Sequence, residues 1–146
     1  MYFYSRFLIY DDLMNTPIVN TTFLFVKRLY YQYLPEGFDQ FQLDQAMIQK
    51  NIWVSKGLQA QLTDQEIETL ALTALLARIG MVDNKQGASA SKLIAERFLK
   101  EQNFPSKRIL SLLHAIDVVH KKATPAQHWE RIMRSDLFEE IGDVWP

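Results

Sequence analysis

The composition and charge of this 146-residue chain exclude several classes of protein. Hydrophobic residues make up 48% of the sequence and charged residues 23%, which is the balance of a globular domain and not of a disordered chain. The formal net charge is -1, so no basic field attracts nucleic acid or an anionic membrane. Cysteine is absent, which excludes disulfides and thiolate chemistry and is consistent with a reducing, cytoplasmic location.

The chain is expected to divide into an N-terminal aromatic segment, residues 1–18, and one helical domain, residues 19–146. The opening run MYFYSRFLIY is apolar, but it is too short to span a bilayer and lacks the basic start and cleavage site of a secretion signal. We expect it to pack against the domain or against a partner. No membrane span is predicted.

Helical spacing of apolar residues, with breaks at proline and glycine, predicts three helices in the first half of the domain, over about residues 19–34, 39–61 and 64–79. Thr63 and Glu66 match a capping box at the start of the third helix. Its apolar stripe is expected to consist of Ile67, Leu70, Ala71, Ala74 and Leu75. The next position on this stripe is Arg78, a guanidinium where the helix should face the core.

Three more helices are predicted after the loop GMVDNKQG, over about residues 90–102, 104–120 and 123–142. Leu93, Ile94 and Phe98 should share the apolar side of the first of these helices. Pro105 should lie in the first turn of the second, and the third should begin at about Thr124. No stretch alternates at a period of two, so the fold class is all-α, a single helical bundle of about six helices.

One triad-like set of residues appears within a predicted helix. Ser111, His114 and Asp117 are spaced three apart, which places them in a row along the helix surface. Such a row provides neither a strained nucleophile nor an oxyanion pocket. We therefore interpret the three residues as a solvated polar face, and His128, near the start of the last helix, as a surface residue.

Three motifs in the C-terminal two-thirds of the chain point to a family. LALTALLARIG is followed by GASASKLIAERFLKEQNFPSKRILSLLHAIDVVH and then by ERIMRSDLFEEIG. This series resembles the HD-domain phosphohydrolases, in which a helix ending in LLHDIG is followed by a helix opened by HE, an FP turn and the segment RDADLLDALG. The resemblance covers about residues 34–142 and implies an HD-like helical bundle.

The resemblance also implies a metal site, because the family binds one or two divalent ions through an early histidine, a His-Asp dyad and a late aspartate. Here the dyad positions hold Ala77 and Arg78, the position of a loop histidine holds Gly87, and no histidine occurs in the range 38–45. Alanine has no side-chain donor, and arginine has only N–H donors and a permanent charge. We expect no metal, no cofactor and no phosphohydrolase activity.

Two residues remain from the implied ligand set. Asp136 stands at the late-aspartate position, and His120 stands near a position where some members have a histidine. We hypothesise that Arg78 and Asp136 form a partly buried ion pair beside His120, so that the guanidinium replaces the metal. In the alternative interpretation Arg78 ends its helix, neutralises the last carbonyls and reaches water with its tip.

These residues predict a catalytically inactive HD-like domain, a pseudo-phosphohydrolase that acts as a protein-interaction, regulatory or signalling module. Its partner would be another protein or a second copy, and Tyr30, Tyr31 and Tyr33 offer an adhesive surface unless the first helix buries them. Alternatively, Arg78 and Lys85 hold a nucleotide or another phosphorylated molecule without turnover. A third hypothesis, an active hydrolase with an unrecognised site, agrees least with the missing ligands.

Overall fold

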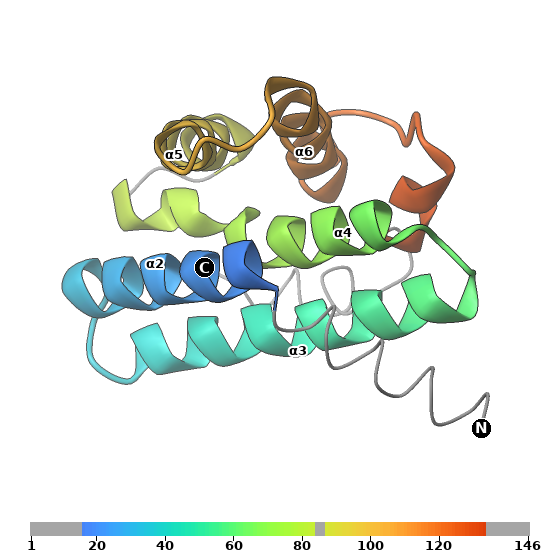
Figure 1. Ribbon diagram of the computed structural model, residues 1–146. Helices are drawn as coiled ribbons and strands as arrows, with labels where there is room; N and C mark the ends of the chain where they lie inside the picture. The colour runs from blue at the N-terminus through green and yellow to red at the C-terminus, as the bar shows by residue number, and fades with distance from the viewer. Residues whose placement is uncertain (1–15, 84–86, 134–146) are drawn as a thin grey trace.

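The computed structural model describes residues 16–83 and 87–133, and over these residues all regular secondary structure is helical (Figure 1). The predicted all-α fold class is confirmed. The α-helices are α2 (Pro17–Tyr33), α3 (Phe38–Gln59), α4 (Asp64–Leu76), α5 (Ala88–Glu101) and α6 (Ser106–Val119), and two 3-10 helices are η1 (Ile79–Asp83) and η2 (His128–Met133). Within the described ranges, none of the helices combines the length and the apolar character that a membrane crossing requires.

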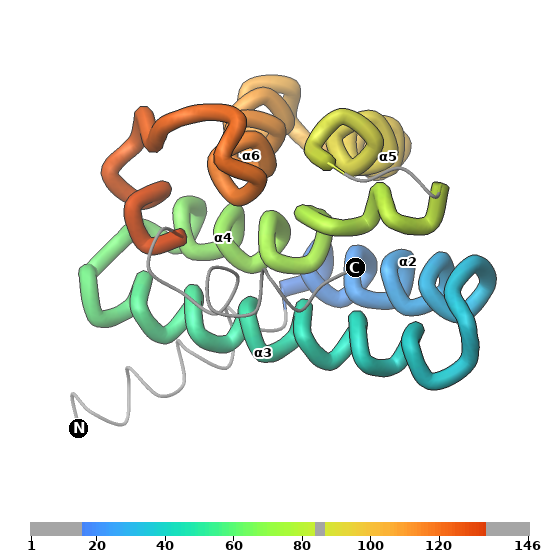
Figure 2. The backbone as a smooth tube through the Cα atoms, turned by 180° about the vertical axis from the view of Figure 1, so that it is seen from behind, coloured from blue at the N-terminus to red at the C-terminus, as the bar shows by residue number. Residues whose placement is uncertain are grey.

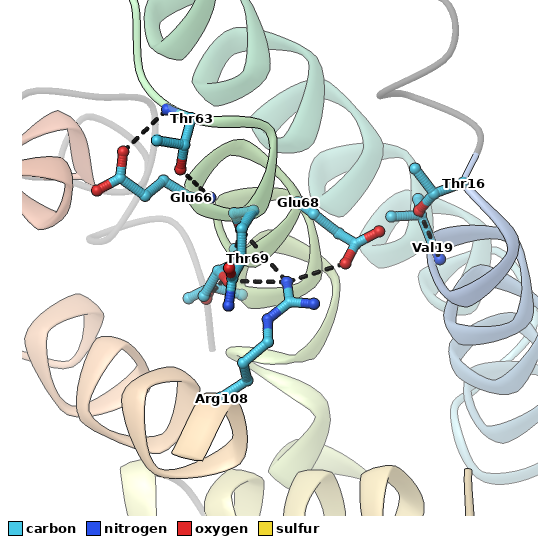
Figure 3. A network of polar contacts seen from close by, with 9 residues as sticks. Thr16, Val19, Thr63, Glu66, Glu68, Thr69 and Arg108 are labelled. Atoms are coloured by element: carbon cyan, nitrogen blue, oxygen red, sulfur yellow. Dashed lines mark hydrogen bonds and ion pairs between the residues drawn. The ribbon is translucent and has the colours of Figure 1, made fainter. Parts of the chain in front are cut away.

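Short polar sequences determine where two of the helices begin. The Thr16 hydroxyl accepts a hydrogen bond from the Val19 amide at 3.4 Å, directly before the proline that opens α2. At the start of α4, the Thr63 hydroxyl accepts from the Glu66 amide at 3.1 Å, and the Glu66 carboxylate accepts from the Thr63 amide at 2.9 Å (Figure 3). The predicted capping box is confirmed.

The helices form two groups that meet at α4. Figures 1 and 2 show α2, α3 and α4 from the side and α5 and α6 almost end-on, so the last two helices cross the first three at a steep angle. Because α4 contacts α2, α3 and α6, it is the central helix of the domain.

The burial of α4 extends beyond the predicted stripe. All five predicted stripe residues are buried, but Leu72, Leu76, Thr69 and Thr73 are buried as well, so the prediction of an amphipathic helix is wrong. Asp64 and Gln65 in the first turn are exposed, but neighbouring helices on several sides leave no solvated face from Thr69 to Leu76. The two threonines are accommodated because their hydroxyls donate to the carbonyls of Gln65 at 2.9 Å and of Thr69 at 2.7 Å.

A second, smaller hydrophobic cluster closes the end of the domain where α3, α4 and α6 meet η2. Trp53 from α3 is fully buried there together with Trp129 and Met133 from η2. Burial of these large side chains fixes η2 against the bundle, since each aromatic removes a large apolar area from water.

The prediction of a long last helix is wrong in its first part. Residues 123–127 are not helical, η2 begins only at His128, and residues 134–142 lie outside the described residues. The cause is the buried carboxylate of Glu130, which accepts hydrogen bonds from the amides of Ala126 and Gln127, both at 2.8 Å. These backbone groups are satisfied without a preceding helical turn, so the helix starts late.

Two smaller predictions also need correction. Pro105 is the N-cap of α6 and not part of its first turn, because its carbonyl accepts the first helical hydrogen bond, from Ile109 at 3.0 Å. Leu93 is exposed, whereas Phe98 is buried as predicted. The buried face of α5 is centred on Ala95 and Leu99, and Leu93 lies away from it.

Candidate functional site

The two positions that the resemblance assigns to a metal-binding dyad lie where the chain leaves α4. The helix ends at Leu76, Ala77 is its C-cap, and Arg78 follows in the turn before η1. The sequence predicted that the helix continues through Arg78 to about residue 79, and this is wrong by about three residues. The position of Arg78 is therefore set by the turn between α4 and η1, and Arg78 does not continue the apolar stripe of α4.

Gly80 explains why the chain turns here. Its amide donates a hydrogen bond to the buried hydroxyl of Ser91 in α5 at 2.8 Å. A Cβ atom on Gly80 would lie only 2.7 Å from the Ser91 backbone nitrogen. Because only glycine permits such a close approach, Gly80 attaches the chain after Arg78 to the start of α5.

His120 reaches the same turn from the far end of α6. It is the C-cap of that helix, and its Nε2 atom lies 2.5 Å from the Ala77 carbonyl oxygen, across 43 residues of sequence. A carbonyl oxygen only accepts hydrogen bonds, so Nε2 carries the proton and donates it. Burial lowers the pKa of His120 below its usual 6.5, and the charge of Arg78 lowers it further, although the Ala77 hydrogen bond opposes this shift.

Tyr30 completes the arrangement from α2. Its side chain is buried, and burial raises the pKa of its phenol above the usual 10.0, while the charge of Arg78 acts in the opposite direction. The guanidinium of Arg78 is therefore within electrostatic reach of both Tyr30 and His120. We call Tyr30, Ala77, Arg78 and His120 the Arg78 cluster; it joins α2, the end of α4 and the end of α6.

Arg78 itself is half-buried, and its Nε atom is fully buried. His120 donates its hydrogen bond to the residue directly before Arg78, and the charge of Arg78 acts on its imidazole. Asp136 and Lys85 lie outside the described residues, so both the Arg78–Asp136 ion pair and a ligand site completed by Lys85 stay predictions.

The sequence analysis passed over two buried glutamines on α3. Gln42, within the range where the resemblance places the early histidine, is 1% exposed, and Gln49 is 0% exposed. The side-chain nitrogen and oxygen atoms of both amides are buried without a hydrogen-bond partner. Glutamine is usually a surface residue, so no sequence signal identified them. Seven residues apart, they share one face of α3, with the small side chain of Ala46 between them.

The polar row on α6 is only partly the solvated face that the sequence predicted, since His114 and Asp117 are half-buried. His114 Nδ1 lies 2.6 Å from the buried Glu130 carboxylate, and Asp117 forms an ion pair with Lys92 at 3.0 Å. Ser111 is exposed. Since His114 and Asp117 have separate partners, the three residues do not form a catalytic relay. On η2, His128 is exposed as predicted, and its Nε2 atom lies 3.3 Å from the Glu66 carboxylate oxygen Oε2.

A second arginine, Arg108, connects α6 to α4 (Figure 3). It forms an ion pair with Glu68 at 2.9 Å and donates to the Thr69 hydroxyl and the Gln65 carbonyl, both at 3.3 Å. Its guanidinium also lies 4.5 Å from the centre of the Phe104 ring. A pocket of about 220 Å³ adjoins this network. Because groups of α4 surround the guanidinium, we interpret Arg108 as a structural link between the helices.

No family model, no curated protein and no solved structure matches the chain. In the ranges 16–83 and 87–133, no three His, Asp or Glu side chains are grouped so that they could hold a metal ion. Fold and site together define an all-α domain in which a half-buried arginine lies where three helices meet.

Proposed function

We propose that this chain is a catalytically inactive HD-like domain that works as a protein-interaction or regulatory module. The observation that supports it most is the hydrogen bond from His120 to the Ala77 carbonyl beside Arg78. At the two dyad positions, Ala77 thus provides only a methyl group and Arg78 a permanent positive charge. His120 donates its Nε2 proton to a backbone carbonyl, so this nitrogen has no free lone pair for a metal.

Electrostatics oppose a divalent ion in this cluster. A doubly charged cation about 5 Å from a guanidinium is repelled by about 7 kcal/mol at an effective dielectric constant of 20. Several anionic ligands would be needed to offset this repulsion. The members of the Arg78 cluster supply none at neutral pH, because burial keeps the Tyr30 phenol neutral and a histidine is never anionic.

The exposed tyrosines of α2 support an interaction module. Tyr30 is buried, but Tyr31 is 79% exposed and Tyr33 is exposed as well. Tyrosine is enriched in protein interfaces, where its ring buries a large area at a small loss of conformational freedom. One tyrosine therefore supports the core, and the other two remain available to a partner.

A metal-binding experiment tests the inactive site. Equilibrium dialysis of the whole protein against Mn²⁺ should show no stoichiometric binding. The double substitution Ala77→His with Arg78→Asp restores the dyad and should increase Mn²⁺ binding at least tenfold. Arg131→Asp, which makes the same charge change at an exposed site, is the matched control and should leave binding unchanged.

Tight binding of Mn²⁺ by the unmodified protein would contradict the proposal. One tightly held Mn²⁺ per chain in the unmodified protein, together with chelator-sensitive release of phosphate from a phosphomonoester, would show an active hydrolase and overturn the proposal.

A further inference from the structure

The geometry points to the groove between α2 and α3 as a docking site, and we propose that its occupant is an acidic amphipathic helix of a partner protein. The groove is a pocket of about 350 Å³, within the range of pockets that bind ligands. Since it names the partner class of an interaction module, this inference rests on the proposed function.

The groove has an apolar floor and apolar edges. Tyr30 and Leu43 line it and are buried, whereas Leu24 is 61% exposed and Tyr31, seven residues further along α2, is also highly exposed. Seven residues correspond to about 10 Å along a helix, so Leu24 and Tyr31 stand two turns apart on one face. This spacing matches the apolar anchors of a helix that binds in a groove.

The charges of the groove select an acidic occupant. Lys27 and Arg28 lie between the two apolar edge residues, both exposed, and α2 contains no acidic residue. The acidic residue of the pocket lining, Asp39, lies in the first turn of α3 and accepts a hydrogen bond from the Gly37 amide at 2.9 Å. Carboxylates beside the anchors of a bound helix would therefore meet two cations across the groove.

The same charges argue against a second copy as the occupant. A twofold symmetric interface places the same surface patch of both subunits face to face. Two copies joined through this groove, with the twofold axis near its basic residues, would bring Lys27 and Arg28 close to the same residues of the other copy, and like charges disfavour such a contact.

Peptide binding to the whole protein tests the proposal. The probe is a fluorescein-labelled synthetic helix of about 16 residues with leucine and tryptophan seven positions apart and four flanking glutamates. A second peptide carries lysines in place of the glutamates. Fluorescence anisotropy should show that the acidic peptide binds at least about tenfold more tightly, with an affinity that falls as salt is added.

Substitutions locate the binding site. Lys27→Glu with Arg28→Glu, and separately Leu24→Ala with Tyr31→Ala, should each weaken binding of the acidic peptide about tenfold. These four side chains are exposed, so unfolding in urea should change little. The controls are Lys121→Glu with Lys122→Glu, a second exposed basic pair, and Leu110→Ala, an exposed leucine on α6; both should bind as the unmodified protein does.

Three results would overturn the proposal. The first is that the acidic peptide does not bind, or binds no better than the basic one. The second is an equal effect of the Lys27/Arg28 and Lys121/Lys122 substitutions. The third is a dimer in sedimentation that dissociates with Leu24→Ala and Tyr31→Ala, which would assign the groove to a second copy. None of these results would alter the Mn²⁺ measurement, because that measurement tests only the Arg78 cluster. The proposal of an inactive site and the proposal of a docking groove can therefore fail independently.

Discussion

Replacing Gly80 with alanine places a methyl group where α5 leaves no room. The added Cβ would lie 2.7 Å from the Ser91 backbone nitrogen, 2.8 Å from the Ala90 Cβ and 2.9 Å from the Ser91 hydroxyl. Two of these atoms are held rigidly by the helix backbone, so rotation of a side chain cannot relieve the overlap. The segment with Gly80 must move away from α5.

This movement has two energetic consequences. Overpacking of a close backbone contact costs about 1–3 kcal/mol. The hydrogen bond from the Gly80 amide to the Ser91 hydroxyl is lost or stretched, which costs about 1–2 kcal/mol more for a buried donor. We expect the free energy of unfolding to fall by about 2–5 kcal/mol, a large part of the 5–15 kcal/mol typical of a domain.

Urea unfolding followed by circular dichroism measures this loss. Gly57→Ala is the matched control, because its Cβ would meet the Ile67 side chain at 3.0 Å, and that side chain can shift. The better helix propensity of alanine should offset this contact, so the control should stay within about 1 kcal/mol of the unmodified protein. A Gly80→Ala protein within about 0.5 kcal/mol of the unmodified one would refute the close approach to α5.

Three further predictions concern buried polar groups. Because burial depresses the pKa of His120 below 6.5, the unfolded chain takes up the proton first as the pH falls through 6.5. Stability should then decline by at most about 1.4 kcal/mol per pH unit, and His120→Gln, which keeps a donor for Ala77, should remove this slope; equal slopes in urea titrations at several pH values would contradict it. Gln49→Met should raise the free energy of unfolding by about 1–3 kcal/mol, since it removes two buried atoms that have no partner, and a loss of stability would show that the amide is satisfied. Arg108→Met should lower it by about 2–3 kcal/mol by isolating the Glu68 carboxylate, and adding Glu68→Gln should restore part of that loss; strict additivity in the double-mutant cycle would argue against the pair.

The candidate site was only partly visible in the sequence. The motif resemblance singled out Arg78 and His120, and in the structure His120 donates to the carbonyl of Ala77, the residue before Arg78. It offered no signal for Gln49 or Glu130, because both residue types are usually exposed and their burial depends on packing by distant elements. The sequence also left undecided whether Tyr31, at the edge of the groove, is exposed. It allowed the tyrosines of the first helix to be either buried or exposed.

The sequence by itself determined the fold class and the order of the helices through α6, which ends at Val119, because caps and apolar periodicity act over three or four residues. The Thr63–Glu66 capping box is such a local signal. Only the tertiary structure decided that α4 is buried on all sides from Thr69 onward, that η2 starts late and that His120 meets Ala77. These outcomes depend on contacts between residues far apart in the chain, such as the 43 residues that separate Ala77 from His120, and on how much space the surrounding helices leave.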